Sequence, residues 1–255
     1  MATRKTKADE VVKVEKLVPY VCPELSAWNE AMRNLPGSGA EYLVVWCSLA
    51  SPIVAPDRTI ALDGLLAAAV VRKTGQPLAS SAHECALVEI PVQRSLCGRF
   101  HLASLAQFEI DKRSSSFTNK RFPMREAQTI STVSRVQEST GPSKGFRIPR
   151  EHLHIDKLEW YCIGHREHIS DLLCNVTALG KKRGVGMGEV VVGSWRVEPI
   201  EPWDGFPVLR DGAPLRPLPQ DWPGLRDYEP AYARLTYPYW DRSREELCAI
   251  PARNV

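Results

Sequence analysis

The part of this sequence whose residue types and spacing best suit chemistry is the glycine-rich run GKKRGVGMG, from Gly180 to Gly188. Glycines let a backbone approach a ligand closely and present successive N–H groups, a geometry that suits phosphate. The three basic side chains in the run would follow a sugar–phosphate backbone. The candidate contact residues are Gly180, Lys181, Lys182, Arg183, Gly184, Gly186 and Gly188.

The order of elements around this run separates it from two other phosphate-binding motifs. The spacing of Gly184, Gly186 and Gly188 is similar to that of a dinucleotide-binding fingerprint, but such a fingerprint follows a strand and opens a helix. Here a predicted helix precedes the run and a predicted strand follows it. A Walker A loop is excluded because the sequence contains no G-K-[ST]. The alternative to a ligand site is a tight helix-to-strand connection with a solvated basic end.

A second candidate is the basic segment from Lys112 to Arg150. It holds nine basic and two acidic residues, a net charge of +7, which leaves −4 for the rest of a chain whose formal charge is +3. A basic segment on a mildly acidic body is typical of an arm that binds a polyanion. The alternative is a solvated loop whose charges do nothing specific. The candidate contact residues are Arg113, Lys120, Arg121, Arg125 and Arg135.

Four histidines are candidates for acid–base or metal chemistry. His152, His154, His165 and His168 lie close together in the sequence, and Cys162 lies among them. Histidine can act as general acid or base in RNA cleavage without a metal. However, partners at familiar metal-ligand spacings are missing, and the histidines fall on different predicted elements. We therefore predict no catalysis, no metal and no cofactor.

The cysteines give no sign of a disulfide framework or a zinc ribbon. Their number, seven, is odd, and none forms a C-x-x-C pair. Several fall within apolar runs, where a thiol behaves as a small hydrophobic group. No apolar run approaches the ~20 residues that span a bilayer, and residues 1–10 lack the apolar stretch of a secretory signal. We expect a cytoplasmic protein that does not enter a membrane.

The elements that would position these residues follow from the periodicity of apolar side chains. Their order is strand–helix–strand, an insertion, then strand–helix–strand, which is the α+β ferredoxin-like (RRM-like) βαββαβ arrangement with both helices on one face. The predicted strands are Tyr42–Leu49, Ala86–Val92, His154–Ile163 and Glu189–Val197, and the predicted helices are Leu62–Lys73 and Arg166–Leu179.

Alternation along the first predicted strand separates two faces. Leu43, Val45, Cys47 and Leu49 fall on one face, and Tyr42, Val44 and Trp46 fall on the other. The second face could stack bases as an RRM sheet does, although the sequence has no recognisable RNP motif. The alternative is that these aromatic side chains belong to the hydrophobic core.

We expect three regions in the chain. Residues 1–40 form an N-terminal extension, and residues 41–198 form the ferredoxin-like domain. Its insertion, 98–150, is predicted as a hairpin with arms at 100–110 and 128–137 and a mobile stretch at 112–125. Residues 199–255 hold ten of the twenty prolines together with many aromatic residues, and we expect a proline-rich extension packed on the domain.

Two stretches resemble a known family. The segment from Trp160 to Trp195 (WYCIGHREHISDLLCNVTALGKKRGVGMGEVVVGSW) resembles part of a RAMP-superfamily subunit of type IV CRISPR effector complexes, the subunit that caps the 5′ handle of the guide RNA. The segment from Leu49 to Ala68 (LASPIVAPDRTIALDGLLAA) is similar to the first strand, loop and helix of that family. The resemblance implies that the glycine-rich run contacts guide RNA (crRNA) and that the basic insertion acts as a thumb against it.

The resemblance also implies partners and a role. The chain would join the backbone and large or small subunits of a ribonucleoprotein complex that defends against viruses and plasmids, and a contact with target DNA stays open. The favoured hypothesis is thus a non-catalytic guide-binding subunit. The alternatives are a metal-independent endoribonuclease that processes guide precursors, and a free-standing module that binds single-stranded RNA.

Overall fold

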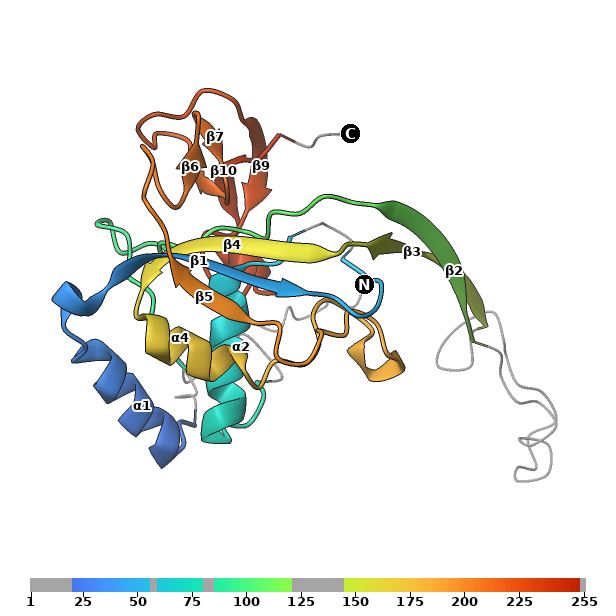
Figure 1. Ribbon diagram of the computed structural model, residues 1–255, viewed down its shortest axis with the longest axis horizontal. Helices are drawn as coiled ribbons and strands as arrows, with labels where there is room; N and C mark the ends of the chain where they lie inside the picture. Colours follow the sequence, from blue (N-terminus) through green and yellow to red (C-terminus); the bar gives the residue numbers. More distant parts are fainter. Residues whose placement is uncertain (1–19, 56–58, 80–84, 121–144, 253–255) are drawn as a thin grey trace, which may run out of the picture.

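The computed structural model describes residues 20–55, 59–79, 85–120 and 145–252 (Figure 1). The fold is α+β, and its strands pair antiparallel. The central sheet has three strands in the order β4-β1-β5, namely β4 (Lys157–Gly164), β1 (Glu41–Ser48) and β5 (Arg196–Pro199). The helices α2 (Leu62–Thr74) and α4 (Arg166–Leu173) cover the same face of this sheet, as the sequence predicts (Figure 1).

The main core lies between that face and the two helices. Leu43, Val45 and Cys47 of β1 are fully buried, which confirms the face predicted from alternation. Trp160 of β4 is buried beside them, and its indole N–H donates to the carbonyl of Ile60 at 2.8 Å. That bond satisfies the one polar group that a buried tryptophan carries.

The two helices end in different ways. α2 stops where the sequence predicts, because Gly75 takes the left-handed conformation (φ +67°) that closes a helix. α4 ends at Leu173, six residues before the predicted end at Leu179. The amide of Leu179 donates to Gly188 and the carbonyl of Val176 accepts from Trp195, at 2.8 and 2.9 Å. These long-range partners replace the helical bonds, while the apolar side chains stay buried.

The strand predicted at Ala86–Val92 is wrong. A helix that the sequence did not predict, α1 (Pro23–Arg33), lies beside this segment. Trp28 donates to the carbonyl of Glu89 at 2.9 Å, and the Asn29 carboxamide pairs with the Leu87 carbonyl and the Glu89 amide, each at 2.8 Å. Side chains of a helix thus satisfy the backbone groups that a neighbouring strand would have paired.

Residues 92–107 take the place beside β4 through single bridges instead of a strand. Val92 pairs with Gly164, Ala103 with Cys162 and Gln107 with Glu159. The strand predicted at Glu189–Val197 is likewise displaced, since β5 covers only Arg196–Pro199. The first two residues of the predicted strand form single bridges: Glu189 pairs with Ala178, and Val190 pairs with Leu49.

The basic insertion contains a long hairpin of β2 (Lys112–Lys120) and β3 (Phe146–His154), which projects from the sheet (Figure 1). Lys112 lies opposite His154, and Lys120 lies opposite Phe146. The predicted arm at 100–110 is therefore wrong, and the arm at 128–137 lies outside the described residues. The stretch predicted as mobile at 112–125 begins as a regular strand, because its residues find cross-strand partners in β3.

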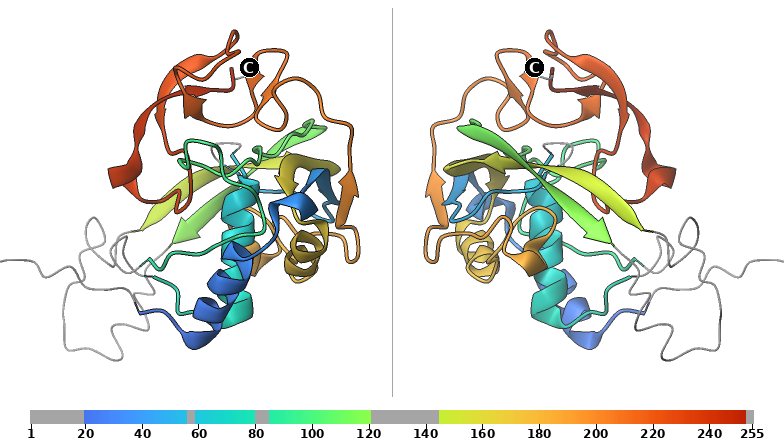
Figure 2. Two further views of the ribbon diagram at one scale, coloured as in Figure 1. Left: turned by 90° about the vertical axis from the view of Figure 1, so that its left-hand side faces the viewer. Right: turned by 90° about the vertical axis from the view of Figure 1, so that its right-hand side faces the viewer.

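The strands within residues 200–252 lie on the side of the sheet away from α2 and α4, whereas Tyr239 reaches the start of α2 (Figures 1 and 2). They form a small sheet in the order β8-β10-β9 and a hairpin of β6 and β7, over a second hydrophobic cluster that includes Phe100. The strands are β6 (Leu209–Arg210), β7 (Ala213–Pro214), β8 (Leu218–Pro219), β9 (Glu229–Ala233) and β10 (Glu246–Ile250). Short 3-10 turns occupy Gly37–Gly39, Arg183–Val185 and Arg242–Arg244.

A buried polar junction of Asp63, His101, Arg216 and Tyr239 connects this region to α2. Arg216 and Asp63 are each about 1% exposed, with 3.4 Å between Nη2 and Oδ2. The Tyr239 hydroxyl donates to Asp63 Oδ1 at 2.8 Å, and Arg216 Nη1 donates to the Ala103 carbonyl at 2.8 Å. Burial, followed by the charge of Asp63, raises the pKa of Tyr239 well above its ordinary value. The hydroxyl therefore stays protonated and keeps donating to the carboxylate.

Candidate nucleic-acid interface

The glycine-rich loop, 180–188, is held at both ends by the segment 52–54. The Lys181 amide donates to the Val54 carbonyl and the Gly188 amide donates to the Pro52 carbonyl, each at 2.9 Å. Between these anchors lies a 3-10 turn, Arg183–Val185, with no buried residue. The loop is therefore fixed at its base, and its tip is exposed to solvent.

The glycines of the loop divide into two kinds. Gly180 and Gly188 have positive φ, +73° and +66°, and a Cβ at either would overlap its surroundings. At Gly188 it would lie 2.1 Å from the Leu179 carbonyl oxygen. At Gly184 and Gly186 a Cβ would meet nothing within 4 Å, although Gly186 also has a positive φ, +79°. The first two glycines are required by packing, whereas the other two leave open backbone at the tip.

The basic side chains of the loop are exposed. Lys181, Lys182 and Arg183 form no ion pair with any described residue. Lys182 has a positive φ of +65° and directly precedes the 3-10 turn. In the described part of the chain, the amides of Lys182, Arg183 and Gly184 also have no acceptor. The tip thus presents three cationic side chains beside open N–H groups, which suits phosphate.

The segment 52–54 joins this loop to the base of the β2–β3 hairpin. Ile53 exchanges two backbone hydrogen bonds of 2.9 Å with Leu153 of β3, and the next residue, Val54, bridges to Lys181 of the loop. The loop and the hairpin consequently lie at the same end of the molecule (Figure 1). The two regions that the charge pattern picked out separately are neighbours in space.

The predicted contact residues of the insertion have different positions. Arg113 lies on β2, with its Nη1 3.5 Å from Glu151 Oε1, and about half of each side chain is exposed. Lys120 is the last residue of β2. Arg121, Arg125 and Arg135 lie outside the described residues. Of this predicted set, the structure therefore gives a side-chain environment only for Arg113.

The hairpin carries an aromatic–cation pair that the charge pattern missed. The Cζ of Arg147 lies 4.0 Å from the centre of the Phe117 ring, on the same face as Arg113. On the opposite face, Ser114 and Ser116 form hydrogen bonds of 2.9 Å with the Nε2 atoms of His154 and His152. A bulky aromatic residue within the polar run KRSSSFTNK was the sequence signal that could have identified the pair.

The four histidines are not brought together into one site. His152 and His154 lie on β3, whereas His165 and His168 lie at the start of α4, beyond the eight residues of β4, which span roughly 26 Å. Burial, followed by the nearby His168, lowers the pKa of His165. Cys162, between the two pairs, is fully buried, and burial raises its pKa to about 12. Among the described residues, no three His, Cys, Asp or Glu side chains gather closely enough to hold a metal ion.

The outer face of the sheet is largely in contact with other side chains. The Tyr42 ring packs edge-on against Phe206 at 5.6 Å, and Tyr161 packs edge-on against Trp203 at 4.8 Å. Trp46 is partly exposed, with Lys157 Nζ 4.8 Å from its ring centre. A base-stacking role for Tyr42 thus competes with its contact with Phe206. Trp46 and Tyr161 both have cationic neighbours, and Arg210 Cζ lies 4.7 Å from the Tyr161 ring centre.

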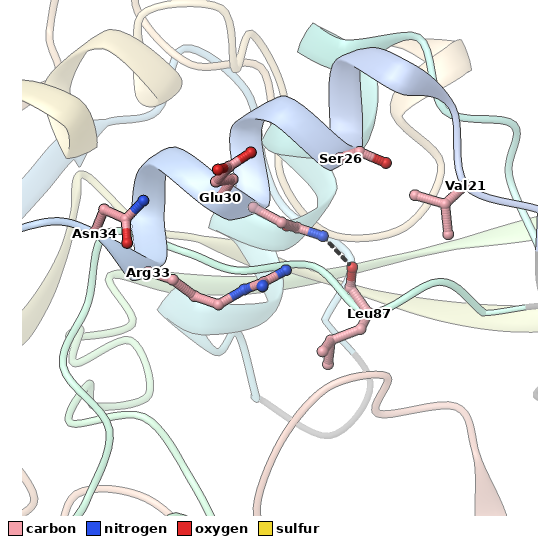
Figure 3. Close-up of a pocket in the computed structure, with 7 residues that line it drawn as sticks. Val21, Ser26, Glu30, Arg33, Asn34 and Leu87 are labelled. Atoms are coloured by element: carbon pink, nitrogen blue, oxygen red, sulfur yellow. Dashed lines mark hydrogen bonds between the residues drawn. The ribbon is translucent and has the colours of Figure 1, made fainter.

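A surface cavity of about 580 Å³ lies beside α1, lined by residues that include Glu30, Arg33 and Leu87 (Figure 3). Two of its polar side chains have structural tasks, since Asn29 donates to the Leu87 carbonyl and the Ser26 hydroxyl donates to the Cys22 carbonyl at 3.3 Å. The lining residues include no histidine or cysteine. No helix within the described ranges is long and apolar enough to span a bilayer.

One comparison with known proteins, the match to a family model, agrees with the resemblance in the sequence. A search of curated proteins gives no match. Among solved structures, a chain of "Cryo-EM structure of the Type III-B Cmr-beta bound to cognate target RNA" is similar, with 9% identity and a TM-score of 0.37, over 69% of this chain and 67% of that one. Residues 106–251 match the family model "CRISPR type IV associated protein Csf3", a range that contains the glycine-rich loop and the hairpin. Since this match covers more than half of the sequence, the chain belongs to the family of the CRISPR type IV associated protein Csf3.

Proposed function

We propose that this chain is a non-catalytic subunit of a type IV CRISPR effector complex that binds the 5′ handle of the guide RNA. The observation that carries the proposal is the connection through residues 52–54. It sets the exposed basic loop beside the base of the basic hairpin and so makes one surface of two elements. A strand of RNA could follow this surface from the loop along the hairpin.

The chemistry of the surface favours a backbone contact. Lysine and arginine side chains neutralise phosphates and displace counterions, a contribution that does not depend on base sequence. The open backbone at Gly184 and Gly186 would allow a phosphate to approach the tip without a steric obstacle. The loop would therefore supply affinity for guide RNA, and the hairpin would extend the contact.

The remaining features of the proposal follow from family membership and the strand arrangement. The chain would contact the backbone and large or small subunits of the complex in the cytoplasm, with target DNA as a further candidate partner. The bridges of residues 92–107 to β4 would represent the fourth strand of a ferredoxin-like domain, with β1 between β4 and β5. Residues 200–252 would then be an extension of that domain.

The test is the affinity of the purified chain for guide RNA across a range of salt concentrations. Lys182→Ala with Arg183→Ala should weaken binding, and the slope of log affinity against log salt should become shallower by about 0.7 for each lost phosphate contact. Arg72→Ala with Arg242→Ala removes the same charge from exposed sites outside the loop and should change neither quantity. Unchanged affinity and slope in the loop variant would leave the loop as a structural connection.

A second assay addresses catalysis. The separation of His152 and His154 from His165 and His168 favours a non-catalytic role, since the four histidines do not form one site, although the rings of His165 and His168 lie 6.3 Å apart. Repeat-containing precursor RNA incubated with the chain without metal should stay intact. Cleavage that disappears in the His154→Ala variant would instead support an endoribonuclease.

A further inference from the structure

Phe117 lies on a projecting hairpin and half of its surface is exposed. It sits on β2 opposite Pro149 of β3, and 50% of the residue is accessible to solvent. A single exposed apolar residue is ordinary on a protein surface. What distinguishes this one is Arg147, whose Cζ lies 4.0 Å from the ring centre. The contact holds a guanidinium and a phenyl ring together as an exposed pair.

The neighbours on this face are hydrogen-bonding and charged groups. Pairing along the hairpin sets Asn119 opposite Arg147 and Ser115 opposite Glu151, and Glu151 in turn pairs with Arg113. The face therefore combines an aromatic surface, a planar cation and small polar side chains. Unpaired bases of RNA are bound by this combination, because they stack on aromatic rings or guanidinium planes and hydrogen-bond at their edges.

We propose that Phe117 and Arg147 form a stacking platform for one unpaired base of the guide RNA. The proposal rests on the proposed function, and it adds to the phosphate contact a second kind of contact with a defined residue. The base must be unpaired, because a base within a duplex is already stacked on both sides. The ring would supply stacking, and Arg147 would also reach a neighbouring phosphate.

The first test compares two phenylalanines of the same hairpin. Phe117 and Phe146 lie on opposite faces, and both are exposed, 50% and 38% respectively. Phe117→Ala should weaken binding of guide RNA at least about fivefold. Its salt slope should match that of the unchanged chain, because stacking releases no counterions. Phe146→Ala should bind like the unchanged chain.

Further variants separate stacking from simple hydrophobic contact. Phe117→Trp should retain affinity, whereas Phe117→Leu, which keeps an apolar side chain but has no aromatic face, should lose as much as Phe117→Ala. A series of guide RNAs, each with one abasic nucleotide, should contain one position whose loss weakens the unchanged chain. That same position should have no effect on the Phe117→Ala variant.

The outcomes distinguish this proposal from the function it rests on. If the loop variant binds weakly while Phe117→Ala and Phe146→Ala both bind normally, the stacking platform is wrong and guide binding stands. If the loop variant also binds normally, both proposals fail. If Phe117→Ala binds RNA normally but no longer associates with another subunit, the face is a protein contact, which would overturn the platform.

Discussion

Charged side chains have opposite tasks in two regions of this molecule. In the buried junction of Asp63, His101, Arg216 and Tyr239, each charge has a partner close by and almost no exposure to water. At the exposed end, the loop residues Lys181–Arg183 have no described ionic partner. A buried charge must be paired because its desolvation is costly, whereas an exposed charge is hydrated and stays accessible to a ligand. The junction thus holds the fold, and the exposed end is available for binding.

The largest expected effect is at the junction. Arg216→Ala leaves the fully buried Asp63 carboxylate without its cation, and loss of one member of a buried pair costs about 3–5 kcal/mol of stability. Urea unfolding should therefore show a much lower midpoint. Arg99→Ala, which removes an arginine from an exposed ion pair with Glu246, should change stability by about 1 kcal/mol or less. Equal effects of the two variants would remove the distinction between buried and exposed charge.

The second effect is the pH dependence of the junction. Burial lowers the pKa of His101 from 6.5 to about 4, so the folded state holds the neutral ring. Between these values the unfolded chain binds more protons than the folded one, and stability falls as the pH falls below 6.5. The loss should approach about 3 kcal/mol near pH 4.

Urea unfolding at neutral and acidic pH measures this loss. His101→Gln should lower stability at neutral pH, because a packed ring is replaced, but it should flatten the dependence between pH 6.5 and 4. If the His101→Gln variant kept the full pH dependence of stability, another titratable group would be its cause.

The smallest of the three effects on stability distinguishes the base of the glycine-rich loop from its tip. Gly188→Ala forces a Cβ to within 2.1 Å of the Leu179 carbonyl at a φ of +66°, and it should cost about 2–3 kcal/mol of stability. Gly184→Ala, in the same loop with open space around it, should change stability by less than about 0.5 kcal/mol. Thermal unfolding of both variants measures the difference. Similar melting temperatures would mean that the loop relaxes and that its base is not fixed.

Local patterns in the sequence were sufficient for several elements. The apolar spacing from Leu62 and the glycine at position 75 predicted α2 to within one residue. Alternation gave the buried face of β1, and the glycine-rich run and the charge of the insertion led to the two exposed elements of the candidate interface. These features depend on neighbours a few residues apart, so periodicity, conformational preference and local charge are enough to define them.

Other features depended on partners far away in the chain. The segment 86–92 has the composition of a strand, but α1 satisfies its backbone from about sixty residues away. α4 ends early because residues 176–179 bond to residues 188–195. Arg216 and Asp63, separated by 153 positions, form one pair that no spacing predicts. A hydrogen bond or ion pair can form with any group that folding brings close. The choice among those groups belongs to the tertiary structure, because only the packed chain sets which of them are near and shielded from water.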